Sequence, residues 1–287
     1  MFVTENTVSA IKNHFFEELD SFYPKTEVSS FFYILADYYL GYSKTDVLLG
    51  MKNNLSESEL LKFHYAIKDL KKQKPIQFIT GVQYFYENEF KVTEHTLIPR
   101  PETEELVDVI VKDNPNFEGT ILDIGTGTGA IAISLDLKLS NSKVTAFDVS
   151  KEALVTAKLN NDDLKAKVDF ELQDILNPNY TGEEFDIIVS NPPYVLNSEK
   201  LEMQSNVLDF EPHLALFVAD NEPLLFYNAI IDFSKNNLKI GGKLYFEINE
   251  KYGKETVEQM NLNGFTSVVL LKDMNNKDRM VKGIKTK

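Results

Sequence analysis

The sequence predicts an α/β fold, in which a mostly parallel, doubly wound sheet closed by an antiparallel strand pair follows a small helical domain. Three observations predict it. From about residue 119 onward, short strand-like runs alternate with helical segments. The last two strand-like runs have no helix between them, which favours antiparallel pairing. The first 75 residues show helical spacing and contain few glycines.

Residues 1–75 are predicted to form the amino-terminal helical domain. Ser56 and Glu59 have the spacing of a capping box, which marks the start of a helix. Apolar residues then recur on one helical face, at Leu60, Phe63, Ile67 and Leu70. An earlier amphipathic helix is indicated by Ile11, Phe15, Leu19 and Phe22.

Residues 76–98 are predicted to form a β-hairpin linker. Phe90 and Val92 lie on one face of an alternating run, and Glu87 with Asn88 offers a turn. The alternative is that this segment is the first β-meander of the second domain.

Residues 99–287 are predicted to form the α/β domain. The strand candidates are TILDI, VTAFDV, VDFELQ, FDIIVS, GKLYFEIN, FTSVVLLK and RMVKGIK. The helix candidates are AIAISLDLKL, KEALVTAKLNN and segments around 222–238 and 252–263. Their alternation indicates parallel strands joined by crossover helices.

Composition restricts the class of protein. The 287 residues, 43% of them hydrophobic, suffice for two modest cores. Without cysteine, disulfides and thiolate sites are excluded, and the four histidines lack metal-ligand spacing, so we expect no metal. The start MFVTENTVSAIKNHFF does not resemble a signal peptide, and FFYILADYYLGY is too short to span a bilayer, so we expect a cytoplasmic protein without membrane contact. A net charge of −14 argues against direct nucleic-acid binding and leaves room for a basic protein partner.

The stretch LDIGTGTGAIA places Gly125, Gly127 and Gly129 between a strand and a helix. Glycines there let the backbone approach a ligand closely, and the helix amino terminus offers unpaired N–H groups. The spacing also fits the dinucleotide fingerprint, so the loop alone leaves NAD and S-adenosylmethionine (SAM) open.

Two carboxylates follow the next strands. Asp148 ends the strand VTAFD, where it can accept the hydroxyl hydrogens of a ribose, although a helix cap is the ordinary role of an isolated Asp. Asp174, after FELQ, is placed similarly for an adenine amino group.

The tetrapeptide NPPY at residues 191–194 decides between the two cofactors. Its prolines end the strand FDIIVS, because proline lacks the N–H that a ladder needs. The Asn191 side-chain oxygen and the Pro192 carbonyl can each accept an N–H from a planar nitrogen, whose delocalised lone pair makes it a poor nucleophile. Tyr194 can pack on the flat face of the substrate group. The sequence therefore predicts methyl transfer from SAM to an amide or amino nitrogen.

The chain resembles the HemK/PrmC family of protein-(glutamine-N5) methyltransferases, which modify the Gly-Gly-Gln glutamine of peptide chain release factors. The resemblance lies in PIQFITG, TLIPRPETEELV, LDIGTGTGAIAI, FDIIVSNPPYV, EPHLAL, GGKLYFEI and KDMNNKDRMVKG. The block IPRPETE is the distinguishing one, because many amino-group methyltransferases share NPPY. The chain departs from the usual family pattern at Glu87, at NEPL (221–224) and at Asn249.

The resemblance implies a class I, Rossmann-like, seven-stranded SAM-dependent methyltransferase domain after a helical domain and a hairpin linker. We expect the helical domain to dock the substrate protein, because a reaction on one glutamine needs recognition beyond the amide; the alternative is that it only stabilises the fold. The resemblance also implies release factors as partners and SAM as cofactor. Because the methylated nitrogen is acidic enough to lose its proton to water, we assign no general base. The cofactor contacts would be Asp123, Gly125, Thr126, Gly127, Thr128, Gly129, Asp148, Asp174, Ile175 and Asn191. The substrate glutamine would be held by Asn191, Pro192, Pro193 and Tyr194, of which Asn191, Pro192 and Tyr194 would be catalytic. Pro99, Arg100 and Pro101 would line the site or have a structural role.

Three rival functions follow from the same residues. An adenine or guanine N-methyltransferase could use NPPY on a flipped base, and it would need a basic strip beside the pocket. A catalytically silent SAM-binding protein would keep the glycine loop without turnover. An NAD-linked oxidoreductase would use the loop but has no need for NPPY.

Overall fold

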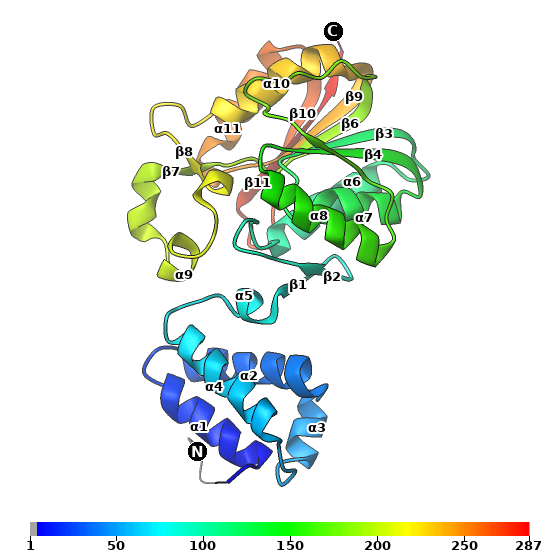
Figure 1. The fold of residues 1–287 in the computed structure, drawn as a ribbon. Helices are drawn as coiled ribbons and strands as arrows, with labels where there is room; N and C mark the ends of the chain where they lie inside the picture. Colours follow the sequence, from blue (N-terminus) through cyan, green and yellow to red (C-terminus); the bar gives the residue numbers. More distant parts are fainter. Residues whose placement is uncertain (1–4, 287) are drawn as a thin grey trace. The chain divides into compact units, whose positions relative to one another are not determined.

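The computed structural model describes residues 5–286, which divide into two compact units. The first comprises residues 5–81 and 205–210, and the second comprises residues 82–204 and 211–286. Figure 1 shows the two units coloured along the chain, with labels on helices and strands of each. No helix among the described residues combines the length and the apolar character that crossing a membrane requires.

The first unit is helical. Its helices are α1 (Val8–Leu19), α2 (Lys25–Leu40), α3 (Lys44–Leu49), α4 (Glu57–Leu70), α5 (Ile76–Thr80) and the short α9 (Ser205–Leu208). Ser56 and Glu59 form the predicted capping box at the start of α4, and the four predicted core residues of that helix are buried. In α1 the predicted Ile11, Phe15 and Leu19 are buried. Phe22 is exposed, because α1 ends before it, and that part of the prediction was wrong.

The second unit is built on a seven-stranded sheet with the strand order β10-β11-β9-β6-β3-β4-β5. The strands are β3 (Glu118–Ile124), β4 (Asn141–Asp148), β5 (Asp169–Leu172), β6 (Phe185–Ser190), β9 (Leu238–Glu247), β10 (Phe265–Lys272) and β11 (Asp278–Lys285). The contacts among β3, β4, β5, β6 and β9 are parallel, whereas β11 is antiparallel to both β9 and β10. The predicted fold class is confirmed.

Helices cover both faces of this sheet, which explains why its strands read as continuous apolar runs. The helices are α6 (Pro101–Asp113), α7 (Ala130–Lys138), α8 (Lys151–Leu164), α10 (Leu225–Asn237) and α11 (Gly253–Leu262). Alternate strand residues belong to different cores: Ile121 and Ile187 pack with α6 and α7, whereas Leu122 and Ile188 pack with α10. The strand period of two thus divides the apolar residues between two layers.

Helix α6 was not assigned from the sequence, where its residues counted only as part of the IPRPETE block. Pro101 is its first residue, a position where a missing N–H is harmless, and Glu102 and Glu104 favour the positive end of the helix dipole. Leu106, Val107 and Ile110 are buried at helical spacing. The signal was therefore present in the sequence.

The predicted hairpin is present, with strands β1 (Val82–Phe85) and β2 (Asn88–Lys91). Its two-residue turn is Tyr86–Glu87, one residue earlier than predicted. Both turn residues have positive φ, because a turn of that hand matches the twist of the paired strands. Phe85 and Phe90 join the core of the sheet with α6 and α7, so the hairpin belongs to the second unit. Residues 76–81 are α5 and its cap, and they belong to the first.

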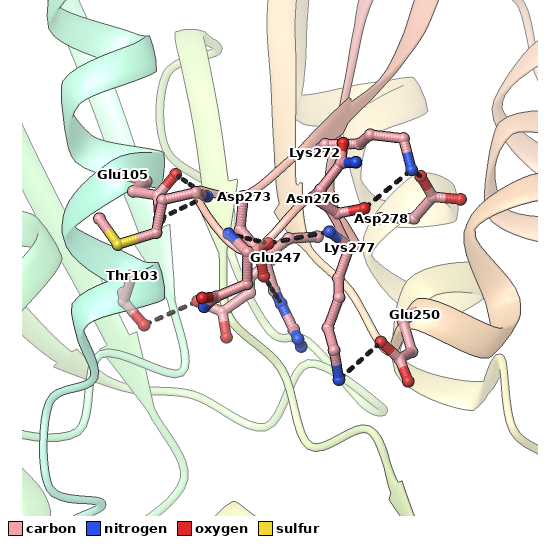
Figure 2. Close-up of polar contacts among 12 residues, drawn as sticks. Thr103, Glu105, Glu247, Glu250, Lys272, Asp273, Asn276, Lys277 and Asp278 are labelled. Carbon is pink, nitrogen blue, oxygen red and sulfur yellow. Dashed lines mark hydrogen bonds and ion pairs between the residues drawn. The ribbon is translucent and has the colours of Figure 1, made fainter.

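The remaining elements are short. They are the parallel pair β7 (Val195–Leu196) and β8 (Phe217–Val218), and the 3₁₀ turns Asn197–Glu202, His213–Ala215 and Glu250–Tyr252. The turn between β10 and β11 is organised by buried Asp273, which accepts hydrogen bonds from the Asn275 and Lys277 amides and from Arg279 (Figure 2).

Candidate active site

The predicted site segments meet because of the strand order. Strand β3 lies between β4 and β6, and all three are parallel, so their carboxyl ends share one edge of the sheet. Ile124 pairs with Phe147 on one side and with Ser190 on the other, and the Ser190 hydroxyl donates to the Ile124 carbonyl at 2.7 Å. The glycine loop, Asp148 and NPPY therefore start next to one another, as expected for a ligand site in an open α/β sheet.

The glycine loop turns sharply between β3 and α7. Gly125 and Gly127 have φ values of +77° and +56°, which only glycine adopts readily, and a Cβ built on either would meet no atom within 4 Å. Both residues face a cavity at their open side. The backbone of the loop can therefore contact a ligand directly.

Asp148 closes the loop from the neighbouring strand. Its Oδ2 accepts a hydrogen bond from the Gly127 amide at 2.8 Å, and its Oδ1 accepts one from the Ser150 amide at 2.8 Å. Burial raises the pKa of Asp148, and these backbone N–H groups oppose the rise. Because a carboxylate has about four acceptor positions, Asp148 retains capacity for the two hydroxyls of a ribose.

A cavity extends along this edge of the sheet. The predicted residues that line it are Gly125, Gly127, Asp148, Asp174, Ile175, Asn191, Pro192 and Pro193. Apolar side chains complete the wall, including Val149, Leu214, Phe226 and Ile230. Asp174 accepts a hydrogen bond from the Leu176 amide at 2.9 Å, which fixes its carboxylate at the rim of the wall.

These residues fit SAM. The open backbone at Gly125 and Gly127 suits the methionine part of the molecule, and Asp148 suits the ribose hydroxyls. The apolar wall suits the flat adenine, with the Asp174 carboxylate as acceptor for its amino group. The site combines a glycine turn with a carboxylate at the end of the next strand. This arrangement is typical of sites that bind a nucleoside through its ribose hydroxyls.

A second, smaller cavity lies on the other side of NPPY. It is lined by Leu97, Arg100, Asn191, Pro192, Tyr194, Val195, Ala215 and Leu216. Four of these residues, Leu97, Asn191, Pro192 and Ala215, also line the first cavity. The two cavities therefore share a wall, and Asn191 and Pro192 are part of it.

The NPPY corner is held from several directions. The Asn191 Nδ2 donates to the Thr103 hydroxyl at 3.1 Å. The Tyr194 hydroxyl donates to Glu247 at 3.0 Å, and the Asn249 side chain donates to the Tyr194 carbonyl at 3.1 Å. Burial and the nearby Glu247 carboxylate raise the pKa of Tyr194 well above its usual value, so the phenol stays protonated. The packing of the Tyr194 ring on a substrate remains a prediction.

Arg100, which lines the second cavity, is held by an ion pair. Its guanidinium bonds to Glu211 at 2.5 Å, and the other oxygen of Glu211 accepts the Ile98 amide at 3.1 Å. The Glu211 side chain is buried, whereas Arg100 is partly exposed to the second cavity. The pair thus joins the segment before α6 to the EPHLAL segment.

Several predicted site residues do not line either cavity. Asp123 is fully buried, accepts the Thr126 hydroxyl at 2.6 Å, and has one oxygen without a partner in the described part of the chain. Burial raises its pKa to about 7. Thr126, Thr128 and Gly129 are likewise buried, and neither Pro99 nor Pro101 belongs to the lining. A direct contact of these residues with cofactor or substrate therefore stays a prediction.

The sequence interpretation missed four polar residues around the site, namely Thr103, Glu211, Glu247 and Asn160. The hydroxyl of Thr103 on α6 donates a hydrogen bond to Glu247 at the end of β9, as Figure 2 shows. Asn160 on α8 bonds to both backbone atoms of Lys91 in the hairpin and donates to the Thr128 carbonyl in the glycine loop at 2.9 Å. Thr103, Glu211 and Glu247 lie within the motif blocks TLIPRPETEELV, EPHLAL and GGKLYFEI. Their place in these blocks was the sequence signal that could have identified them.

The comparisons with known proteins agree with this geometry. A family model described as the PrmC N-terminal domain matches residues 14–81, and one described as the methyltransferase small domain matches residues 101–209. A release factor glutamine methyltransferase of Flavobacterium psychrophilum is 47% identical over 279 residues, which are 95% of this chain and 98% of the relative. One of Bacteroides thetaiotaomicron is 45% identical, covering 92% of this chain and 95% of the relative.

Solved structures share the fold of the second unit. A methyltransferase from Pyrococcus furiosus has a TM-score of 0.50 at 20% identity, covering 69% of this chain and 89% of its own. The Thermus thermophilus 16S rRNA N2 G1207 methyltransferase, solved with AdoMet and guanosine, has a TM-score of 0.50 at 16% identity, covering 71% of this chain and 49% of its own. These likenesses concern the fold alone. Because its relatives are nearly half identical over almost the whole length, the chain belongs to the HemK/PrmC family of release factor glutamine methyltransferases.

Proposed function

We propose that this protein is an enzyme that transfers the methyl group of SAM to the side-chain amide nitrogen of the glutamine in the Gly-Gly-Gln motif of peptide chain release factors. The family membership supports the reaction, and a release factor as substrate would assign the protein to translation termination in the cytoplasm. Nothing in the geometry favours a nucleic-acid substrate over a protein substrate.

One observation carries the proposal, namely the wall that the two cavities share. The larger cavity fits SAM, and the smaller one is of a size for a side chain rather than for a nucleoside. Asn191 and Pro192 stand between them, so a donor in one and an acceptor in the other would meet at these two residues. Methyl transfer needs the two reactants to approach in line, and the wall that the cavities share at Asn191 and Pro192 is where that approach would take place.

The residues of NPPY act on the acceptor nitrogen. An amide nitrogen is a poor nucleophile, because its lone pair is delocalised into the carbonyl group. The Asn191 Oδ1 and the Pro192 carbonyl would each accept one of its N–H groups, which orients the nitrogen and stabilises the positive charge that it gains. The two prolines, of which Pro192 is buried and Pro193 partly buried, would keep the two acceptors at a fixed separation and exclude water.

The cofactor, when bound, supplies a methyl group on a positively charged sulfur. In the balanced reaction the nitrogen–carbon bond forms as the sulfur–carbon bond breaks, the sulfur keeps the bond's electron pair, and the nitrogen then loses one proton. The N–H of the methylated nitrogen is acidic enough to pass its proton to water, so no side chain is assigned as general base. The role of the chain is therefore mainly positioning, for which Asn191 and Pro192 suffice.

The helical unit is proposed to dock the release factor, because selection of one glutamine needs recognition beyond the amide. Leu48 and Leu49 on α3 are 62% and 83% exposed, which is unusual for adjacent leucines and offers an apolar contact. Replacing both with Asp should raise the KM for the release factor by about tenfold and leave SAM affinity unchanged. Equal KM values for the variant and the wild type would show that the release factor does not dock on Leu48 and Leu49.

The proposed reaction is tested by transfer from methyl-labelled SAM to a purified bacterial release factor. Two controls accompany it, a release factor in which the Gly-Gly-Gln glutamine is replaced and a double-stranded DNA. Label on the intact factor alone supports both the reaction and its target residue. Label on DNA would favour the base methyltransferase, and SAM binding with no labelled acceptor would favour the silent SAM-binding protein.

A further inference from the structure

The Asn191 side chain can act only in one of its two orientations. If its oxygen faces the substrate, it accepts an N–H of the glutamine amide. If its NH2 group faces the substrate instead, two donors oppose each other and the nitrogen is repelled. The two ends of an amide have nearly the same size, so packing alone does not select between them. The inference below concerns what makes the selection, and it rests on the proposed function.

A chain of three polar groups leads away from Asn191, of which Thr103 and Glu247 are buried and Tyr194 is partly buried. Its Nδ2 lies 3.1 Å from the Oγ1 of Thr103, and that hydroxyl lies 2.7 Å from Oε2 of Glu247. The other carboxylate oxygen of Glu247 accepts the Tyr194 hydroxyl at 3.0 Å. Thr103 is 4% exposed and Glu247 is 1% exposed. Figure 2 shows Thr103 on α6 pointing to Glu247 at the end of β9.

The carboxylate fixes the direction of every hydrogen bond in this chain. An ionised carboxylate can only accept, so both neighbouring hydroxyls must donate their single proton to Glu247. The Thr103 oxygen is then left with acceptor capacity only, and its other neighbour must be a donor. That neighbour is the NH2 group of Asn191, so the Asn191 oxygen occupies the opposite end of the planar amide.

The hydrogen bonds of Glu247 are those of an ionised carboxylate, because each of its two oxygens accepts a hydroxyl, although its pKa lies above the ordinary value. Burial raises its pKa, whereas the two donated hydroxyls of Thr103 and Tyr194 and the positive charge of Arg279 oppose the rise. A purely structural role explains the arrangement less well, because well-packed apolar residues would stabilise a core as effectively as a buried carboxylate does. The carboxylate is instead placed where it can impose direction on an amide.

We infer that Thr103 and Glu247 form a hydrogen-bond relay that holds the Asn191 side chain with its oxygen toward the acceptor nitrogen. Both are positioning residues, since they act on the substrate through Asn191. The relay starts in α6 and ends in β9, which explains why a functional threonine stands inside the PETEE segment of this chain.

The test compares three isosteric or conservative variants with the full-length wild type. Thr103→Val keeps the shape and removes the hydroxyl, Thr103→Ser keeps the hydroxyl, and Glu247→Gln removes the obligate acceptor. Thr256→Val is the matched control, because Thr256 is also buried and donates its hydroxyl to the carbonyl of Tyr252, directly before α11, at 2.8 Å. The measurements are kcat for a release factor, the SAM dissociation constant, and the side-chain amide resonances of Asn191 in asparagine-labelled protein, identified by their loss in Asn191→Asp.

Thr103→Val should lower kcat by about tenfold to a hundredfold with SAM affinity changed less than about twofold, and it should shift the Asn191 amide resonances. Glu247→Gln should lower kcat by about tenfold, because either end of its amide can face Thr103. Thr103→Ser and Thr256→Val should stay within about threefold of the wild type.

Three results would overturn the relay. They are unchanged Asn191 resonances in Thr103→Val, a wild-type kcat for Thr103→Val, and a loss in Thr103→Ser as large as that in Thr103→Val. The resonances are measured without substrate, so they test the relay even if the wild type methylates no release factor. A wild type that methylates no release factor would count against the proposed function and not against the relay.

Discussion

The two units of this chain differ in what they bury. In the first unit, the buried side chains of the described residues are apolar, with Thr80 as the single polar one. The second unit buries many polar and ionisable groups, among them Asp123, Asn160, Glu211, Glu247 and Lys285. Burying a polar group is costly unless it is paired, so such groups indicate positions where the fold serves more than stability. Several of them surround the carboxyl ends of β3 and β9, where the proposed chemistry takes place.

The largest effect is expected from the apolar core of the helical unit. Phe63 on α4 is fully buried and packs on Phe32 and Tyr39, with ring centroids 5.6 and 5.4 Å away. Phe63→Ala should lower the free energy of unfolding of this unit by about 3–5 kcal/mol, because it leaves a cavity. Chemical denaturation followed by tyrosine fluorescence measures it. SAM affinity should not change, and a parallel loss of SAM binding would contradict the separation of roles between the units.

A smaller loss is expected from the buried lysine of the second unit. The Lys285 ammonium donates to the carbonyls of Ser234, Lys235 and Leu238, and it thereby caps the carboxyl end of α10. Lys285→Met should cost about 2–3 kcal/mol, because three carbonyls lose their donor. Lys254→Met, on the exposed side of α11, serves as the control and should change the free energy of unfolding by less than about 0.5 kcal/mol. Similar values for both variants would remove the capping role.

Asn160 tests whether a buried amide connects the hairpin to the glycine loop. Asn160→Ala should cost about 1–2 kcal/mol of stability and weaken SAM binding by about threefold to tenfold, because the Thr128 carbonyl and both backbone atoms of Lys91 lose a partner. Equilibrium dialysis with labelled SAM measures the second effect. The exposed Asn236→Ala is the control, and an unchanged SAM affinity in Asn160→Ala would limit this residue to a structural role.

The smallest effect concerns pH. Because the pKa of Asp123 is raised to about 7 in the folded protein, folding is favoured while this carboxyl is protonated, and the contribution is lost as the pH rises through about 7. Between about pH 6 and about pH 8, the wild type should therefore lose on the order of 1 kcal/mol relative to Asp123→Asn. Urea denaturation of both proteins across this range provides the measurement. Parallel pH profiles would show that Asp123 does not titrate there.

Local patterns were enough to predict the fold. Strand runs such as FDIIVS and the capping box at Ser56 depend on neighbours in the sequence, and both were confirmed. The glycine loop and NPPY could be placed together because the ends of parallel strands meet at one edge. Thr103 and Glu247 escaped the sequence interpretation, since their bond joins residues 144 positions apart. The sequence also did not distinguish Gly127, which lines the cavity, from its neighbour Thr128, which is buried and does not line it. That difference depends on how the loop packs in three dimensions.

The most direct test of the account measures Asn191→Ala in two ways, by its single-turnover methylation rate with a release factor and by its SAM dissociation constant. If Asn191 holds the acceptor nitrogen, the rate should fall by about a hundredfold to a thousandfold, as when one preorganised group is removed from other active sites, while SAM affinity changes little. A rate within a few-fold of the wild type, or an equal loss of rate and SAM affinity, would contradict the central role of Asn191.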